Sequence, residues 1–140
     1  MEQQVVVTLI AAIISGILAT IITIGINTYQ QYIRRKQDLV DDIFGFKYQL
    51  TNGNVINGDI YSKGFSRAMN RVQIVFCKDK KVLDKLDFFY NTLLISDKEE
   101  RKIKSDEALI NLIKELCKAA HIKYDNWNDS VFKRSFDIGN

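Results

Sequence analysis

Three basic residues and an amide side chain lie at helical spacing in the middle of the chain. Lys63, Arg67 and Arg71 recur every four residues, and Asn70 lies beside them. On a helix the three cations share a face, because one turn takes about 3.6 residues. Guanidinium groups bind phosphate oxygens in pairs of hydrogen bonds, and an asparagine amide can read a base edge or a ribose. The row therefore predicts a site for an anionic ligand. The alternative is a solvated face that forms salt bridges with acidic residues of the next helix.

Two other basic clusters have different interpretations. Arg34, Arg35 and Lys36 form a run that we interpret as an anchor to the anionic membrane surface. Lys133 and Arg134 lie among aromatic residues near the C-terminus and form a second, weaker candidate for anion binding.

Residues typical of catalysis or metal binding are few. The chain has one histidine and two cysteines, Cys77 and Cys117, with no CxxC pair, so a zinc site would lack ligands. His121 lies one helical turn after Cys117 and could form a thiol–imidazole pair with it. We favour a structural role for both, since Cys117 lies beside an apolar stripe and His121 near a helix end. No glycine-rich phosphate loop is present. The sequence therefore predicts no enzyme, no metal site and no cofactor.

The N-terminal part of the chain has the composition of a membrane span. Glu2 is the only charged residue before Arg34, and Val5–Ile26 is 22 residues long without a charge. As a helix this stretch is about 33 Å long, enough to cross a hydrocarbon core of about 30 Å. A cleaved signal peptide would need a basic N-terminal region, which is missing here. We expect a transmembrane helix over residues 1–33, interface included.

The charges that flank the span predict its orientation. The basic run at Arg34 follows it, so the positive-inside rule places the N-terminus outside and the rest of the chain in the cytoplasm, at the cell (inner) membrane. Tyr29 and Tyr32 would lie in the interfacial aromatic belt. In the reducing cytoplasm the two cysteines are expected to be free thiols. The net charge of +3 is too small to indicate binding of duplex nucleic acid.

One face of the span carries small and hydroxyl-bearing residues, and the opposite face carries large aliphatic ones. Small residues let helices approach closely within a membrane. The face therefore predicts self-association into a homo-oligomer, although small residues are common in transmembrane helices anyway. The predicted seam is made of Thr8, Ala12, Ser15, Gly16, Ala19 and Thr23.

The remainder of the chain is predicted to be helical and contains no proline. The fold class expected is all-α: an N-terminal transmembrane helix with a stalk, followed by a small three- to four-helix cytosolic domain. Residues 34–58 form the stalk helix and an Asn-Gly-rich loop. The loop is expected over residues 51–59, where a hairpin is an open alternative. Residues 59–140 form the helical domain with an aromatic C-terminal tail.

Apolar residues recur at helical spacing over three stretches of this domain. Helices are expected over residues 60–78, 80–95 and 105–122, with Ser105 as the N-cap of the last one and the charged stretch 97–104 before it. The inward residues expected are Phe65, Met69, Val72 and Phe76, then Val82, Leu83, Leu86, Phe89, Tyr90 and Leu93, then Leu109, Leu112, Ile113, Leu116 and Ala120. Phe88 points away from its stripe, and Trp127 and Phe132 belong to the tail.

The stretch RAMNRVQIVF, residues Arg67–Phe76, is similar to a helical pattern in small bacterial proteins that begin with one membrane helix. The overall plan resembles the membrane effectors of antiviral signalling systems, including type III CRISPR-associated transmembrane effectors. That resemblance implies a cytosolic domain that binds a cyclic nucleotide and perturbs the membrane segment.

Two functions remain open on the sequence. The first is an oligomeric membrane effector whose cytosolic domain binds an anionic ligand, with a cyclic oligonucleotide second messenger as the candidate, and then permeabilises or perturbs the membrane. The second is a membrane-tethered scaffold or accessory protein that presents its helical domain to a protein partner through Phe88, Trp127 and Phe132. A holin-like lysis protein is a distant third.

Overall fold

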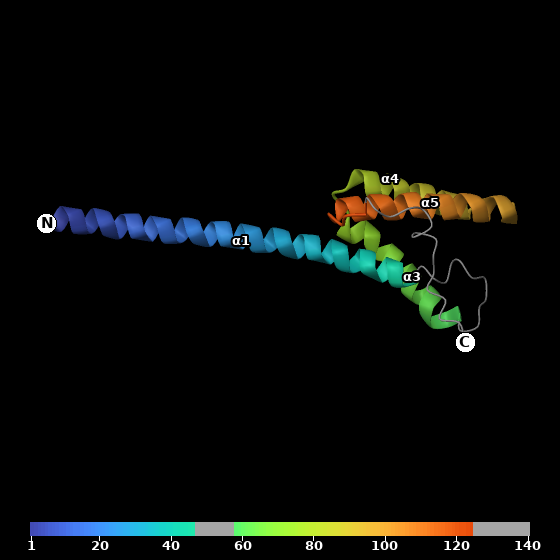
Figure 1. The fold of residues 1–140 in the computed structure, drawn as a ribbon, viewed down its shortest axis with the longest axis horizontal. Coiled ribbons are helices and arrows are strands. Elements are labelled where there is room, and N and C mark those ends of the chain that lie inside the picture. The colour runs from blue at the N-terminus through green and yellow to red at the C-terminus, as the bar shows by residue number, and fades with distance from the viewer. Residues whose placement is uncertain (47–57, 125–140) are drawn as a thin grey trace. The chain divides into compact units, whose positions relative to one another are not determined.

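The chain folds into four helices over the residues that the structure describes. The structure is a computed structural model and describes residues 1–46 and 58–124. The helices are α1 (Glu2–Phe46), α3 (Gly58–Val75), α4 (Lys80–Leu93) and α5 (Lys98–Ala119), and the described residues contain no strand (Figure 1). The all-α prediction is confirmed. The predicted loop over residues 51–59 lies outside the described residues except for Gly58 and Asp59, which begin α3.

The chain divides into two compact units, Met1–Ile33 and Arg34–Asn140. In the first unit, α1 is long and apolar enough to cross a membrane. Its aliphatic side chains are exposed along the whole stretch, from Val5 at 67% to Ile26 at 52%. An apolar surface of this extent is unfavourable in water, so the helix requires a lipid or protein environment.

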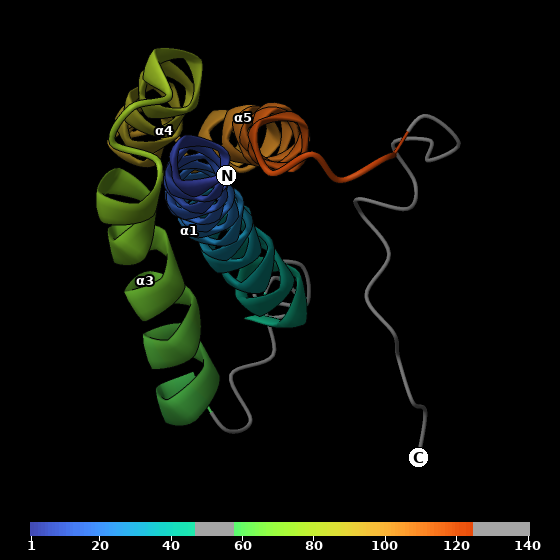
Figure 2. The same cartoon turned by 90° about the vertical axis from the view of Figure 1, so that its left-hand side faces the viewer.

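In the second unit, the end of α1 packs with α3, α4 and α5 around one core. Every helix places apolar side chains at intervals of three and four residues on its inner face. Figure 2 shows the four helices from one end, with α4 and α5 next to each other. The fully buried large side chains come from all four helices and include Leu39 and Ile43 of α1, Val72 of α3, Val82 and Leu86 of α4, and Leu112, Ile113 and Leu116 of α5. Phe76, the residue that follows α3, is also fully buried.

The segment predicted as a stalk contributes to this core. Leu39, Val40 and Ile43 are at most 1% exposed and belong to the same cluster as the three later helices. Gly64 lets α3 lie close to the last turn of α1, because a Cβ atom there would lie 2.6 Å from Cε1 of Phe46. The end of α1 is therefore the first helix of the bundle.

The predicted helices agree with the structure in the apolar faces of α3 and α5, but all three end earlier than predicted. Every inward residue predicted on α3 and α5 is buried, Ala120 at the end of α5 included. On α4, Val82, Leu86 and Phe89 are buried as predicted, Leu83 and Tyr90 are only half-buried, and Leu93, the last residue of the helix, is 42% exposed, contrary to the prediction. The last helix begins at Lys98 and not at Ser105. Its N-cap is Asp97, whose carboxylate accepts a hydrogen bond of 2.7 Å from the amide of Glu100.

Candidate functional site

The four residues predicted to bind an anion all lie on α3 with exposed side chains. Lys63, Arg67 and Arg71 are spaced by one turn each, which is about 6 Å along the helix axis. The structure therefore provides the row of cations that the prediction requires, on the surface of the second unit.

Arg71 is joined to α1. Its Nη1 atom lies 2.8 Å from Oδ2 of Asp42, and both side chains are about half exposed, at 45% and 46%. The alternative interpretation placed the acidic partner of this row on the next helix. In the structure the partner of Arg71 comes from the end of α1 instead. Arg67 and Asn70 form no hydrogen bond or ion pair with any residue that the structure describes. Arg67 is therefore the guanidinium of the row that is available to a ligand.

Lys36 differs from its predicted role as a membrane-surface anchor. Its side chain is buried, with 3% exposed, whereas Arg34 and Arg35 are exposed as an anchor requires. Lys36 lies on the same helical face as Leu39, Val40 and Ile43, so the helix turns it into the bundle. The prediction is wrong for Lys36, and this three- and four-residue spacing is the signal that was available in the sequence.

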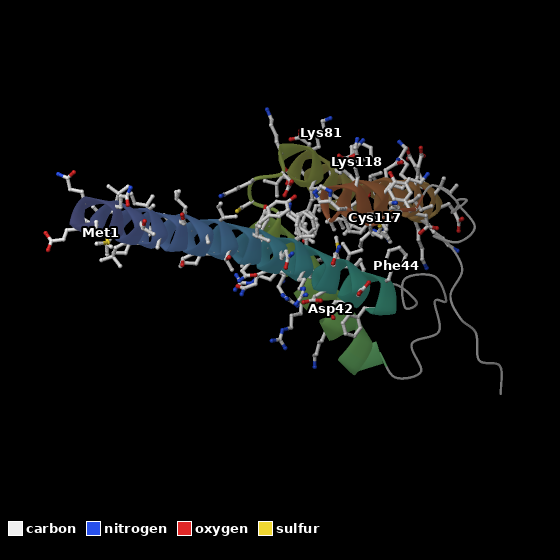
Figure 3. The ribbon with its side chains drawn as sticks, turned by 60° about the vertical axis from the view of Figure 1, so that its left-hand side comes forward. Met1, Asp42, Phe44, Lys81, Cys117 and Lys118 are labelled. Atoms are coloured by element: carbon white, nitrogen blue, oxygen red, sulfur yellow. The ribbon has the colours of Figure 1, made fainter. Side chains whose placement is uncertain are left out.

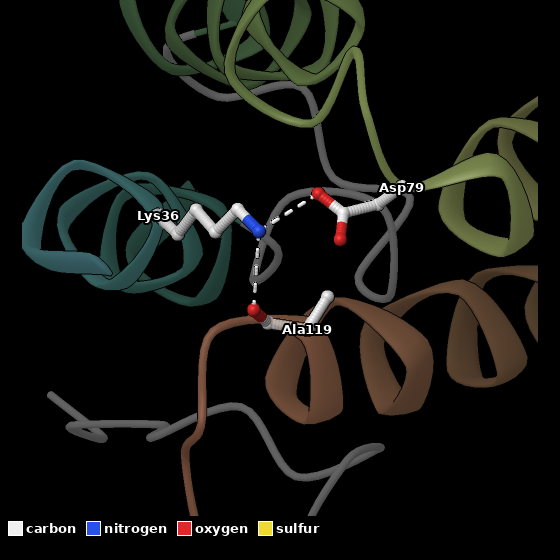
Figure 4. Close-up of polar contacts among 3 residues, drawn as sticks. All are labelled: Lys36, Asp79 and Ala119. Atoms are coloured by element: carbon white, nitrogen blue, oxygen red, sulfur yellow. Dashed lines mark hydrogen bonds and ion pairs between the residues drawn. The ribbon is translucent and has the colours of Figure 1, made fainter. Parts of the chain in front are cut away.

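The ammonium group of Lys36 joins three elements (Figure 4). Its Nζ atom lies 2.8 Å from Oδ2 of Asp79, which is the N-cap of α4, and 3.3 Å from the carbonyl oxygen of Ala119 in the last turn of α5. It also lies 5.2 Å from the ring centroid of Phe76. The Oδ2 atom of Asp79 accepts no hydrogen bond within the described residues, so the Lys36 charge compensates it as an ion pair. A buried cation at the end of one helix and a carboxylate at the start of another are both favoured by the helix dipoles.

The carbonyl groups at the C-terminus of α5 accept hydrogen bonds from the residues that follow the helix and from α1. Gln37 donates a hydrogen bond of 3.1 Å to the carbonyl of Ala120. The amide of Ile122 donates to the carbonyl of Cys117 at 2.9 Å, and that of His121 to Lys118 at 3.2 Å. This is the Schellman pattern, and it requires the positive φ of 57° that His121 adopts.

Cys117 is not an activated thiol. Burial, and secondarily the negative charge of Asp41, raises its pKa from 9.0 to about 11. The thiol is therefore protonated at neutral pH, whereas a nucleophilic cysteine must form a thiolate. His121 is exposed beyond the end of α5, where it takes part in the helix cap. These observations agree with the structural role predicted for both residues.

The predicted transmembrane seam is an exposed row along α1 in the first unit. The hydroxyl groups of Thr8, Ser15 and Thr23 each donate a hydrogen bond of 2.8 Å to a carbonyl four residues earlier. Their protons are satisfied within the helix, so they need no partner helix. Close approach between the small residues Ala12, Gly16 and Ala19 is then the remaining argument for self-association, which stays a prediction.

Phe88 is 56% exposed on α4, as predicted, and it borders a groove of about 480 Å³ between α4 and α5. Ile95 and Glu107 are among the other residues that line this groove. Trp127, Phe132, Lys133 and Arg134 lie outside the described residues, so their roles stay predictions.

Comparison with known proteins identifies a family without a known activity. Residues 1–131 match DUF6680, described as a family of unknown function. No curated protein and no solved structure matches the chain.

Proposed function

The chain belongs to the DUF6680 family, and we propose that it is a single-pass, oligomeric membrane effector whose cytosolic bundle binds an anionic ligand on α3. The ligand class that best suits the row of cations is a phosphate-bearing one, with a cyclic oligonucleotide second messenger as the candidate. The span lies in the inner membrane with the bundle in the cytoplasm, as the basic residues after it favour. Binding alters the membrane segment and thereby permeabilises or perturbs the membrane.

The observation that carries the proposal is the ion pair between Arg71 and Asp42. It connects the row of cations on α3 to the helix that continues from the apolar span. An exposed pair of this kind stabilises a protein by about 0–1 kcal/mol. A phosphate that bridges Arg67 and Arg71 forms stronger, charge-assisted hydrogen bonds and competes with Asp42 for the same guanidinium. Ligand binding and the α3–α1 contact are thus linked.

A change in the α3–α1 contact can affect the span because α1 is a single helix from Glu2 to Phe46. Leu39, Val40 and Ile43 hold the end of that helix in the core. A ligand that favours one arrangement of α3 against α1 shifts a two-state equilibrium of the bundle. In an oligomer joined through the seam, the shift changes how the spans pack.

The test is ligand binding by the full chain in detergent, measured by calorimetry against a panel of cyclic oligonucleotides. Arg67→Gln removes the guanidinium without a protein partner, and we expect affinity to fall by about tenfold or more, since a hydrogen bond to a charged group contributes about 1.5–3 kcal/mol. Asp42→Asn releases Arg71, and we expect affinity to rise by up to about fivefold.

Lys98→Gln is the control, because it removes an exposed charge from the start of α5 and leaves the row intact. Its affinity should equal that of the unmodified chain. If no member of the panel binds, or if Arg67→Gln binds as well as the control, the proposal is wrong.

A second candidate is the membrane-tethered scaffold. The exposed ring of Phe88 beside the α4–α5 groove favours it, because aromatic residues are common in the centres of protein interfaces. Size measurement in detergent separates the two functions. An oligomer whose size or shape changes with a cyclic oligonucleotide supports the effector, and a monomer indifferent to all of them supports the scaffold.

A further inference from the structure

The contacts of Lys36 determine which surface of the bundle lies next to the start of the second unit. Through Asp79 and Ala119 they hold the α3–α4 turn and the end of α5 against the first turns of that unit. Lysines that are distant in sequence consequently gather at the same end as Arg34 and Arg35. These are Lys78, Lys80 and Lys81 around the start of α4, and Lys118 in the last turn of α5. We call these six residues the basic end.

Three of these six cations line a hollow. A depression of about 320 Å³ lies between α4 and α5, and Lys80, Lys81 and Lys118 are among the residues that line it. Figure 3 shows Lys81 and Lys118 on the outside of these two helices. All six cations are exposed, and none forms an ion pair within the described residues. Two carboxylates line the hollow: Asp79, which Lys36 neutralises, and Glu115. With six cations against Glu115, this surface keeps a net positive charge.

If the first unit crosses a membrane, the chain position of Arg34 and Arg35 brings these two residues close to the membrane surface. Arg34 follows Ile26, the last residue of the uncharged apolar stretch, by eight residues, or about 12 Å of helix. The headgroup layer extends about 5–7 Å beyond the hydrocarbon core. A further Debye length of about 8 Å at physiological salt keeps this position within reach of lipid charges.

From this placement we propose that the basic end binds anionic phospholipid headgroups of the cytoplasmic leaflet. Four to eight Lys or Arg residues just after a span form a typical surface for anionic lipids. Soluble phosphates offer the same chemistry, but the span holds the basic end at a high local concentration of headgroups, which favours lipid. The lipid contact requires the membrane span but not ligand binding by α3, because Lys63, Arg67 and Arg71 are not part of the basic end.

Cys77 allows a direct test, since it is exposed in the turn next to Lys78, whereas Cys117 is buried. The full chain is labelled at Cys77 with a fluorophore and reconstituted into vesicles that carry a headgroup-linked quencher. One set of vesicles contains phosphatidylcholine alone, and the other also contains phosphatidylglycerol. We expect stronger quenching with phosphatidylglycerol, and we expect high salt to remove the difference because screening shortens the reach of the charges.

Lys81→Gln with Lys118→Gln should reduce the difference, because each lysine contributes about fivefold to the docking equilibrium near an anionic surface. Lys98→Gln with Lys102→Gln removes the same charge from the start of α5 and should retain it. Circular dichroism verifies that both variants are folded. The proposal is overturned if quenching is equal in the two lipids, or if both double variants lose the difference equally. Either result leaves the binding of cyclic oligonucleotides by α3 unaffected, so the two proposals fail separately.

Discussion

Lys36 connects the start of the second unit to two other elements through one ammonium group. Its charge lies between a carboxylate at the start of α4 and a carbonyl at the end of α5, at 2.8 and 3.3 Å. Removing the charge from a buried pair leaves the opposite charge without compensation, which is more unfavourable than removing both. The contribution of Lys36 to stability should therefore depend on whether Asp79 keeps its charge.

We expect Lys36→Met to lower the free energy of unfolding by about 2–3 kcal/mol, since it leaves a largely buried carboxylate unpaired. Adding Asp79→Asn should restore part of that loss. Urea denaturation of the full chain in a mild detergent, followed by circular dichroism, measures both variants. Lys118→Ala is the control at an exposed neighbour and should change stability by at most about 0.5 kcal/mol. Equal losses for Lys36→Met and the control would contradict the role given to Lys36.

The two cysteines should differ sharply in reactivity. At pH 8 a maleimide should modify Cys77 in the native chain and both thiols after denaturation, because Cys117 is buried with its pKa raised to about 11. The stability contribution of the protonated Cys117 thiol is present below pH 9.0 and is lost as the pH rises towards about 11, since the unfolded chain ionises first. Cys117→Ala should flatten this decline. Two reactive thiols in the native chain would refute the burial of Cys117.

The sequence predicts residue positions well where helical periodicity decides them. Phe65, Met69 and Val72 are buried as predicted, because one amphipathic face specifies which side of α3 turns inward. The pairing of Lys36 with Asp79 and of Arg71 with Asp42 depends on how separate helices pack. No local pattern carries that information, so neither pair could be predicted.

At the scale of elements, α5 begins earlier than its apolar stripe suggests. The charged stretch over residues 97–104 resembles a loop in composition, yet it forms the first turns of the helix. Asp97 caps it, Glu99 and Glu100 lie in the first turn where the dipole favours them, and Lys104 pairs with Glu100 at 2.6 Å. These turns extend beyond the core, and their aliphatic residue Ile103 is 67% exposed, so they show no apolar stripe.

The N-cap residue allows a test of where α5 begins, after Asp97 as in the structure or at Ser105 as the sequence predicts. Asp97→Ala should lower the free energy of unfolding by about 1 kcal/mol, the usual effect of losing an N-cap. Ser105→Ala should have almost no effect, because its hydroxyl donates to the carbonyl of Lys102 inside the helix and caps nothing. Thermal unfolding of the two single variants checks this. A larger loss for Ser105→Ala than for Asp97→Ala would favour the later start.

At the scale of the whole molecule, α1 contributes to both units. Its N-terminal part is apolar and exposed, and its last turns supply Leu39, Val40 and Ile43 to the core. The sequence predicts the all-α class and the apolar helix, because 22 uncharged residues and the absence of proline leave few other interpretations. The last turns of α1 are predicted only as a stalk, because the residues that they pack against are distant in the sequence. A single span with the bundle in the cytoplasm is the premise of both the effector proposal and the lipid-binding proposal.

The most direct test of that premise is the accessibility of Cys77 to a membrane-impermeant maleimide in bacterial cells that express the full chain. Because Cys117 is buried, Cys77 alone reports the side on which the bundle lies. We predict that the protein stays in the membrane fraction, that Cys77 is protected in intact spheroplasts, and that it is labelled in inverted vesicles. Labelling of Cys77 in intact spheroplasts, or recovery of the chain in the soluble fraction, would contradict a membrane-anchored cytosolic bundle.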